Sequence, residues 1–166
     1  MTPKAIKNRM WGRGAGLGLL IAALSAEAAG VRVVEIRSDP PAPSGKQVWS
    51  FRMTPSQTRD YDQLVFECVL RQEYDKRGSD GSVRRVVTEP ATFVYREKNV
   101  RMVAELDKHI SFWVPLGKEH IQQAYGKLFN PNVPVTIARF RITAFEKGKE
   151  VWTIEVPTSG VHQFDP

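Results

Sequence analysis

Residues 135–156 read VTIARFRITAFEKGKEVWTIEV and carry the clearest structural pattern in this 166-residue chain. Apolar and polar residues alternate on both sides of a Lys-Gly pair, which is typical of two antiparallel strands joined by a tight turn. We expect a three-residue loop, a type I turn in which Gly148 adopts the left-handed conformation and forms a bulge. This register collects the apolar residues on one sheet face. It pairs Ile142 with Trp152, Phe140 with Ile154 and Ala138 with Val156.

Runs rich in β-branched and aromatic residues recur along the rest of the chain and are separated by turns. Only residues 118–129 show helical spacing of apolar side chains. We therefore expect an all-β fold, an antiparallel β-sandwich of about 8–9 strands with at most one short helix. It resembles immunoglobulin and fibronectin type III domains in architecture only, and a small β-barrel is the alternative. The expected strands are residues 31–37, 47–53, 63–74, 83–89, 91–97, 100–106, 110–114, 135–146 and 151–156.

The first 28 residues have the three-part layout of a secretory signal peptide. A basic segment precedes an apolar run over residues 14–26, and Ala26-Glu27-Ala28 places small residues at the positions that a signal peptidase recognises. As a helix, the apolar run would be roughly 20 Å long, too short to cross a hydrocarbon core of about 30 Å comfortably. We expect export to the periplasm or the extracellular space, with membrane contact only through this segment if it is not cleaved.

Residues 29–166 suffice for a single domain, which we expect to be the β-sandwich. The Pro-rich stretch at 39–45 predicts an extended connector. Residues 1–28 hold four basic groups and one acidic group, so they supply +3 of the formal net charge of +6. The remaining +3 indicates a surface of mixed charge, which argues against a dedicated nucleic-acid-binding protein.

Cys68 is the single cysteine, and it lies inside an apolar run over residues 64–70. We expect it to be buried, with an intermolecular disulfide as the alternative for an exported protein. Asp107 and His109 could share one side of an extended segment, although a surface histidine is the simpler interpretation. The sequence therefore predicts no metal site and no cofactor. The histidines are widely spaced, at His109, His120 and His162.

Two aromatic residues are candidates for ligand binding. Alternation over residues 110–114 directs Ile110, Phe112 and Val114 to the core and Trp113 to the outside. An exposed tryptophan can stack on a sugar ring or anchor a protein interface, and Tyr125 could add a second stacking surface. The alternative is that the segment at 117–129 covers Trp113. Trp152 and its neighbours on the C-terminal hairpin are expected in the core.

Four arginines form the densest basic group of the sequence. A hairpin expected around residues 98–99 would place Arg96 opposite Arg101, and like charges in that position are unfavourable unless an acidic partner lies between them. Nearby glutamates could neutralise them. The alternative hypothesis is that the four arginines bind a glycan or an anionic polymer of the cell envelope. The four candidates are Arg84, Arg85, Arg96 and Arg101.

The sequence contains none of the common catalytic signatures, neither Gly-x-Ser-x-Gly, nor His-Glu-x-x-His, nor a phosphate-binding glycine loop. We expect a non-catalytic β-sandwich that acts as a protein-binding or structural module of the cell envelope or the secreted space. Its partner would be another envelope or secreted protein, bound through a sheet edge or a loop cluster. The alternatives are a carbohydrate-binding domain that uses exposed aromatic residues, and a hydrolase with a carboxylate or histidine site assembled from loops.

Overall fold

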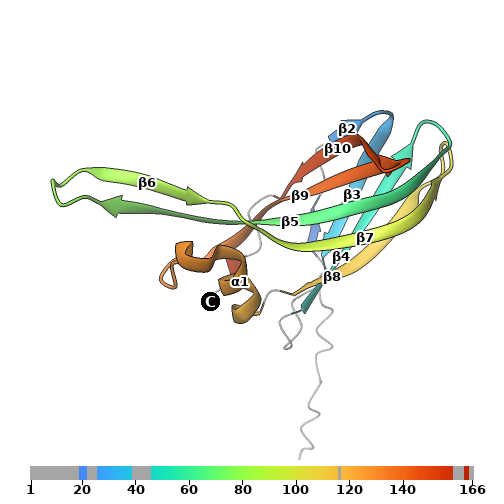
Figure 1. The fold of residues 1–166 in the computed structure, drawn as a ribbon. Coiled ribbons are helices and arrows are strands. Elements are labelled where there is room, and N and C mark those ends of the chain that lie inside the picture. The colour runs from blue at the N-terminus through green and yellow to red at the C-terminus, as the bar shows by residue number, and fades with distance from the viewer. Residues whose placement is uncertain (1–18, 22–25, 39–45, 116, 159–162, 165–166) are drawn as a thin grey trace, which may run out of the picture.

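Two antiparallel β-sheets pack face to face in the computed structural model, with one short helix beside them (Figure 1). The expected all-β sandwich is therefore confirmed. The structure describes residues 19–21, 26–38, 46–115, 117–158 and 163–164. The Pro-rich connector and most of the expected signal peptide lie outside these residues.

The first sheet has the strand order β1-β3-β4-β8, with β2 paired to the same edge of β3 as β1. Its strands alternate between the core and the outside, as β8 shows: Ile110, Phe112 and Val114 are buried, while the residues between them are exposed. The strands of this sheet are β1 (Leu19–Ile21), β2 (Ala26–Ala28), β3 (Val31–Ser38), β4 (Lys46–Pro55) and β8 (Lys108–Pro115).

The second sheet is organised around β5, which pairs with β9, β7 and β6 along different parts of its length. The order β10-β9-β5 continues to β7 over the first part of β5 and to β6 over its last part, and β11 pairs with β9. The strands are β5 (Arg59–Arg77), β6 (Val83–Thr88), β7 (Ala91–Met102), β9 (Val135–Glu146), β10 (Lys149–Pro157) and β11 (Gln163–Phe164).

Aromatic side chains from both sheets meet at the centre of the sandwich. Phe51 of β4 lies 5.3 Å from Phe66 of β5 and 5.1 Å from Phe140 of β9, measured between ring centroids. Trp49 also contacts Phe140, at 4.7 Å. These four side chains are essentially inaccessible to solvent. The core thus forms where the inward faces of β4, β5 and β9 exclude water between the two layers.

The end of β5 and the whole of β6 project from the sandwich as a two-stranded ribbon, which we call the arm (residues 72–88; Figure 1). Val83 and Val87 of the arm are 60% and 45% exposed. Gln72 is buried at the base, where its side-chain amide donates hydrogen bonds to the carbonyl oxygens of Asn130 and Val133. The arm is therefore anchored at its base and surrounded by solvent further out.

The helix α1 (Lys118–Tyr125) is followed by a 3-10 turn (Gly126–Leu128). It buries Ile121 and Tyr125 against the core, and Gly126 ends it with a positive φ of 55°. Within the described part of the chain, no helix has the length and apolar character needed to cross a membrane.

The turn and register expected for the C-terminal hairpin were wrong. Lys149 pairs with Glu146, so the loop has only two residues, Lys147 and Gly148, with φ values of 51° and 72°. This is the pattern of a type I′ turn, whose twist matches that of the flanking strands. A bulge between Glu150 and Trp152 then shifts the register by one. The resulting pairs are Trp152 with Ala144, Ile154 with Ile142, and Val156 with Phe140.

The bulge explains why the apolar residues still share one face despite the different turn. Without it, Trp152 would lie opposite Thr143, and the inward side chains of β10 would turn outward. With it, Trp152, Ile154 and Phe140 are all buried. The indole N–H of Trp152 donates a hydrogen bond to the Tyr61 hydroxyl at 3.1 Å.

The hairpin expected around residues 98–99 was also wrong. β7 continues through this point as one strand, and β5 is its partner. Arg96 pairs with Val65, and Arg101 pairs with Asp60, so the two arginines do not face each other. The whole length of β7 can pair with β5 because β5 is longer than the sequence pattern indicated.

Candidate functional site

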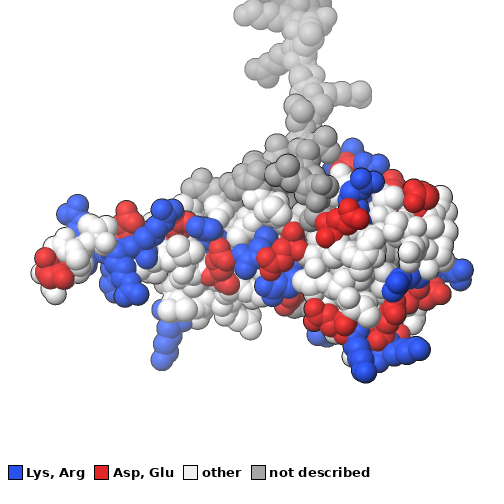
Figure 2. Space-filling view, turned by 90° about the horizontal axis from the view of Figure 1, so that it is seen from above, with Lys and Arg blue, Asp and Glu red and all other residues white. Residues whose placement is uncertain are grey.

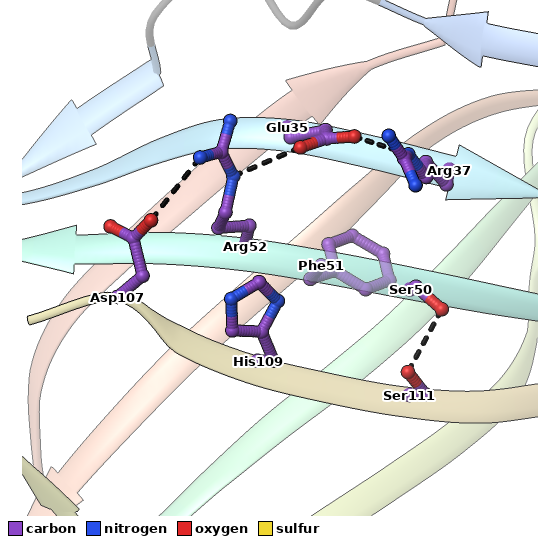
Figure 3. A pocket seen from close by; sticks show the side chains of 8 residues that line it. All are labelled: Glu35, Arg37, Ser50, Phe51, Arg52, Asp107, His109 and Ser111. Carbon is purple, nitrogen blue, oxygen red and sulfur yellow. Dashed lines mark hydrogen bonds and ion pairs between the residues drawn. The ribbon is translucent and has the colours of Figure 1, made fainter.

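The outward face of the β3, β4 and β8 strands forms an open, shallow depression lined by polar side chains (Figure 3). Alternation along each strand produces this face, and in β3 a bulge between Val33 and Glu35 places Glu35 on the outward side together with Arg37. Register then aligns the outward residues in rows across the sheet. We call this surface the polar face, and its side chains are Glu35, Arg37, Ser50, Arg52, Asp107, His109 and Ser111.

Arg52 stands at the centre of an ion-pair network on the polar face (Figure 3). Its guanidinium lies 2.9 Å from the Glu35 carboxylate and 3.2 Å from the Asp107 carboxylate. Arg37 pairs with the other oxygen of Glu35, and the Thr54 hydroxyl donates a hydrogen bond to Asp107 at 2.6 Å. The two carboxylates are thus held by neighbouring side chains.

Asp107 keeps its negative charge over a wide pH range. The hydrogen bond from Thr54 is the largest cause that lowers the pKa of this carboxyl group, and the nearby charges of Arg52 and His109 act in the same direction. A carboxylate with a lowered pKa is a poor proton donor near neutral pH. Asp107 is therefore suited to positioning Arg52 and to accepting hydrogen bonds.

Three side chains of the polar face form fewer contacts within the protein and can hydrogen-bond a ligand: Ser50, Ser111 and His109. The two serine hydroxyl oxygens are 2.8 Å apart, so one hydroxyl donates to the other. The His109 imidazole forms no hydrogen bond with the described residues, and His109 lies across from Arg52 in the strand register. Because the serines contact each other and not His109, the face holds no nucleophile hydrogen-bonded to a base.

Trp113 lies on the same outward face, two residues beyond Ser111 on β8. Two residues correspond to about 7 Å along a strand. Trp113 is 49% exposed, and Val48, its partner on β4, is 39% exposed. The expectation that Ile110, Phe112 and Val114 face inward is confirmed, and the segment at 117–129 leaves half of Trp113 accessible to solvent.

Tyr125 does not form a second stacking surface, because it is only 4% exposed. Its ring packs against Phe129 with a centroid distance of 6.0 Å. Burial raises the pKa of its hydroxyl above the usual range, and the nearby charge of Glu89 adds to the shift. The helical spacing of Ile121 and Tyr125 directs both side chains to the core.

The four candidate arginines do not form a single basic patch. In the strand register, Arg84 and Arg85 lie opposite Lys76 and Asp75 on the arm. Arg96 lies opposite Val65 in the sandwich. Lys76 and Val65 are eleven residues apart on β5, or roughly 36 Å along an extended strand. Arg101 lies further away still, where it forms a 3.9 Å ion pair with Asp60. The four arginines are close in sequence, but they lie opposite different parts of the long strand β5 and are therefore far apart in space.

The arm nevertheless carries several basic side chains close together (Figure 2). Lys76 and Arg84 face each other across the ribbon, and Arg85 forms an ion pair with Glu73 on the neighbouring strand. Figure 2 shows blue side chains along the arm, an acidic tip, and mixed charges over the sandwich.

The residues predicted to have structural roles lie in the core or, in the case of Gly148, in the turn of the C-terminal hairpin. Cys68 is a free thiol, 1% exposed, and burial raises its pKa well above the ordinary value of 9.0. The backbone N–H of Gly148 donates a hydrogen bond to the Asp62 carboxylate at 2.8 Å. Trp152, Phe140, Ile142 and Ile154 lie in the core cluster.

Most of the polar face, including Glu35, Arg37 and Arg52, was not predicted from the sequence. The alternation phase of residues 31–37 and 47–53 contained part of the signal, because it separates inward apolar residues from outward polar ones. It could not show that the two segments are neighbours. Asp107 and His109 were considered as a pair, and they do line the same depression. No group of three or more potential metal ligands occurs among the residues described by the structure.

Comparisons with known proteins give little further information. The sequence matches no protein-family model and no curated protein. The crystal structure of Spo0M, a sporulation control protein from Bacillus subtilis, is similar with a TM-score of 0.42 at 11% sequence identity. The match covers 78% of this chain and 49% of that chain, so it spans about half the length of Spo0M.

Proposed function

We propose that the chain is an exported, non-catalytic binding module and that its polar face binds a carbohydrate chain. The observation that carries this proposal is Trp113, which is half exposed on the same sheet face as the polar depression. Export is supported by the signal-like composition of residues 1–28.

Carbohydrate fits the chemistry of this face better than other ligands. A sugar ring offers an apolar side for stacking on the Trp113 indole and hydroxyl groups for hydrogen bonding around its edge. The Ser50–Ser111 pair offers a donor and acceptors two residues away from Trp113 along the same sheet, and His109 lies two residues further along β8. Because Arg52 is neutralised by Glu35 and Asp107, the centre of the face does not require a strongly anionic ligand.

Retardation in gels that contain defined polysaccharides tests the proposal. The panel consists of a soluble β-glucan, chitosan, dextran and solubilised peptidoglycan fragments. At least one of them should retard the protein, and Trp113→Ala should weaken that binding about tenfold, since one stacked ring contributes on the order of 1.4 kcal/mol. Trp113→Phe should restore part of it.

Leu128→Ala is the matched control, because Leu128 is also a large exposed apolar residue, 64% accessible, and lies outside the polar face. It should bind as the parent protein does. The carbohydrate proposal is wrong if no polysaccharide retards the protein, or if Trp113→Ala and Leu128→Ala behave alike.

A second candidate function, binding of a protein segment at a sheet edge, is favoured by a different observation. The outer edge of β3 is paired only with β1 and β2 in the part of the chain that the structure describes, and both belong to residues 1–28. An exported protein that loses these residues would present this edge to a partner.

A further inference from the structure

The outer edge of β3 accepts other strands along most of its length. β2 pairs with residues 31–33 of β3, and β1 pairs with residues 36–38, both antiparallel. β4 occupies the opposite edge. β3 is therefore an inner strand only as long as residues 19–28 are part of the chain.

The expected cleavage site coincides with the turn between β2 and β3. Ala28 pairs with Val31, and Ala29 and Gly30 form the two-residue connection with φ values of 48° and 76°. Cleavage after Ala28 would separate the chain at the first residue of this turn and remove both β1 and β2. The processed chain would then begin two residues before β3.

Removal of β1 and β2 would open one side of the sandwich. The backbone groups of β3 that face them would lose their partners, and unpaired sheet edges readily accept another strand. β2 also contacts β10 of the second sheet (Figure 1). Ala28 packs against the core cluster. Val31 and Val33, now 2% and 0% exposed, would lose this cover.

We propose that, in the processed protein, this vacated edge of β3 binds an extended segment of a partner protein, which takes the position of β2 and β1. This inference rests on the proposed export of the chain, and it is independent of carbohydrate binding at the polar face. Strand addition of this kind gains affinity from backbone hydrogen bonds and specificity from alternate side chains.

The charges along β3 define the chemistry of the segment. Arg32 and Arg37 are exposed on the outward side of the strand, and the acidic residue between them, Glu35, already pairs with Arg37 and Arg52. In the full chain, Glu27 lies directly opposite Arg32. A matching segment therefore carries acidic residues on its outward side and small apolar residues, as at Ala28, on its inward side.

The same charges disfavour a second copy of this chain as the occupant. In an antiparallel β3–β3 pairing that keeps Val33 opposite Ile36, Arg32 of each copy would lie opposite Arg37 of the other. Like charges directly across a strand pair are destabilising. The edge is thus better matched to an acidic segment of a different protein.

Peptide binding to the processed protein, purified after export, tests this inference. The probe is an acetylated eight-residue peptide of alternating valine and glutamate, and the comparison peptide has lysine in place of glutamate. Isothermal titration should show binding of the glutamate peptide to the processed protein and none to the unprocessed full chain, in which β1 and β2 occupy the edge. Amide exchange should slow along residues 31–38.

Arg32→Glu reverses the charge opposite the peptide. It should weaken binding of the glutamate peptide roughly five- to tenfold and strengthen binding of the lysine peptide. Arg101→Glu is the control, because Arg101 is also highly exposed but lies on β7, and it should leave both affinities unchanged. A general loss of stability would weaken the binding of both peptides, so it could not make Arg32→Glu bind the lysine peptide more tightly and the glutamate peptide more weakly.

Four outcomes would overturn the inference. Three are a processed protein whose first residue is not Ala29, equal binding of the peptide by the processed and unprocessed chains, and no binding at all. A stable dimer of the processed protein, detected by sedimentation, would also overturn it. Retention by polysaccharide that depends on Trp113 would be unaffected in the last three cases, so the two proposals can fail separately.

Discussion

The β9–β10 hairpin and the arm are both pairs of antiparallel strands that follow each other in sequence, but their environments differ, since β9 also pairs with β5 in the second sheet. Phe140 and Ile142 of β9 are completely buried, whereas Val83 and Val87 of β6 are largely exposed. Both form antiparallel strand pairs, and the β9–β10 pair contains one bulge. Local sequence pattern is therefore enough to form a ribbon, while its burial depends on whether another layer lies against it.

Strand length explains why only one ribbon is covered. β3, β4 and β8 contain 8, 10 and 8 residues, or roughly 26–34 Å, whereas β5 contains 19 residues and could extend to roughly 63 Å. The first sheet cannot cover the whole of β5, and the uncovered length becomes the arm. A two-stranded ribbon without a packed face contributes little stability.

The largest expected effect comes from removing a core aromatic ring. Phe140→Ala should lower the free energy of unfolding by about 3–5 kcal/mol, because it leaves a cavity between Trp49 and Phe51. Val83→Ala on the arm should change it by less than about 0.5 kcal/mol. Urea unfolding followed by tryptophan fluorescence measures both. A comparable loss for Val83→Ala would mean that the arm packs against something in solution, and the comparison would fail.

A smaller effect is expected from two glycines in equivalent backbone conformations. Gly148 and Gly81 have φ values of 72° and 82°, and a Cβ added to either would meet no other atom within 4 Å. Valine at either place costs about 1–2 kcal/mol of backbone strain. Gly148→Val should show this loss in global unfolding, while opening of the arm tip relieves the strain of Gly81→Val. Equal losses in thermal and urea unfolding would show that the arm and the hairpin unfold as one unit.

The smallest effect on stability concerns the buried thiol on β5. Burial raises the pKa of Cys68, so the folded state favours the protonated thiol. Below the ordinary thiol pKa of 9.0, the thiol is protonated in both the folded and the unfolded state and does not make stability depend on pH. Above that pH only the unfolded chain ionises, so the free energy of unfolding falls as the pH rises. Cys68→Ala should therefore reduce the decline in stability, measured by urea unfolding, between about pH 9 and 10.

A thiol-reactive dye gives the matched comparison on the arm. Cys68 should react only at the rate of global unfolding, whereas Val83→Cys in a Cys68→Ala background should react at once. Rapid labelling of Cys68 below about pH 9 would show that the part of β5 inside the sandwich opens as easily as the arm.

The sequence was sufficient to predict most of the strands and the inward residues of the C-terminal hairpin. Phe140, Ile142 and Trp152 were expected in the core and are buried. For Trp113, alternation predicted an outward direction, with cover by residues 117–129 as the alternative, and the side chain is 49% exposed. The sequence was not sufficient to predict register. The type I′ turn at Lys147-Gly148 and the bulge before Trp152 compensate each other, and the alternation pattern alone is also satisfied by the three-residue loop.

The alternation of side chains determined the all-β class and the core, because successive residues of a strand necessarily point to opposite sides of a sheet. Only the tertiary structure decided which strands are neighbours, since backbone hydrogen-bonding groups are the same in every strand and do not identify their partners. The polar face follows from that choice: Arg52 and Thr54 reach Asp107 across 55 and 53 residues of sequence. The separation of Arg84 from Arg96 has the same origin, because both pair with one strand long enough to hold them far apart.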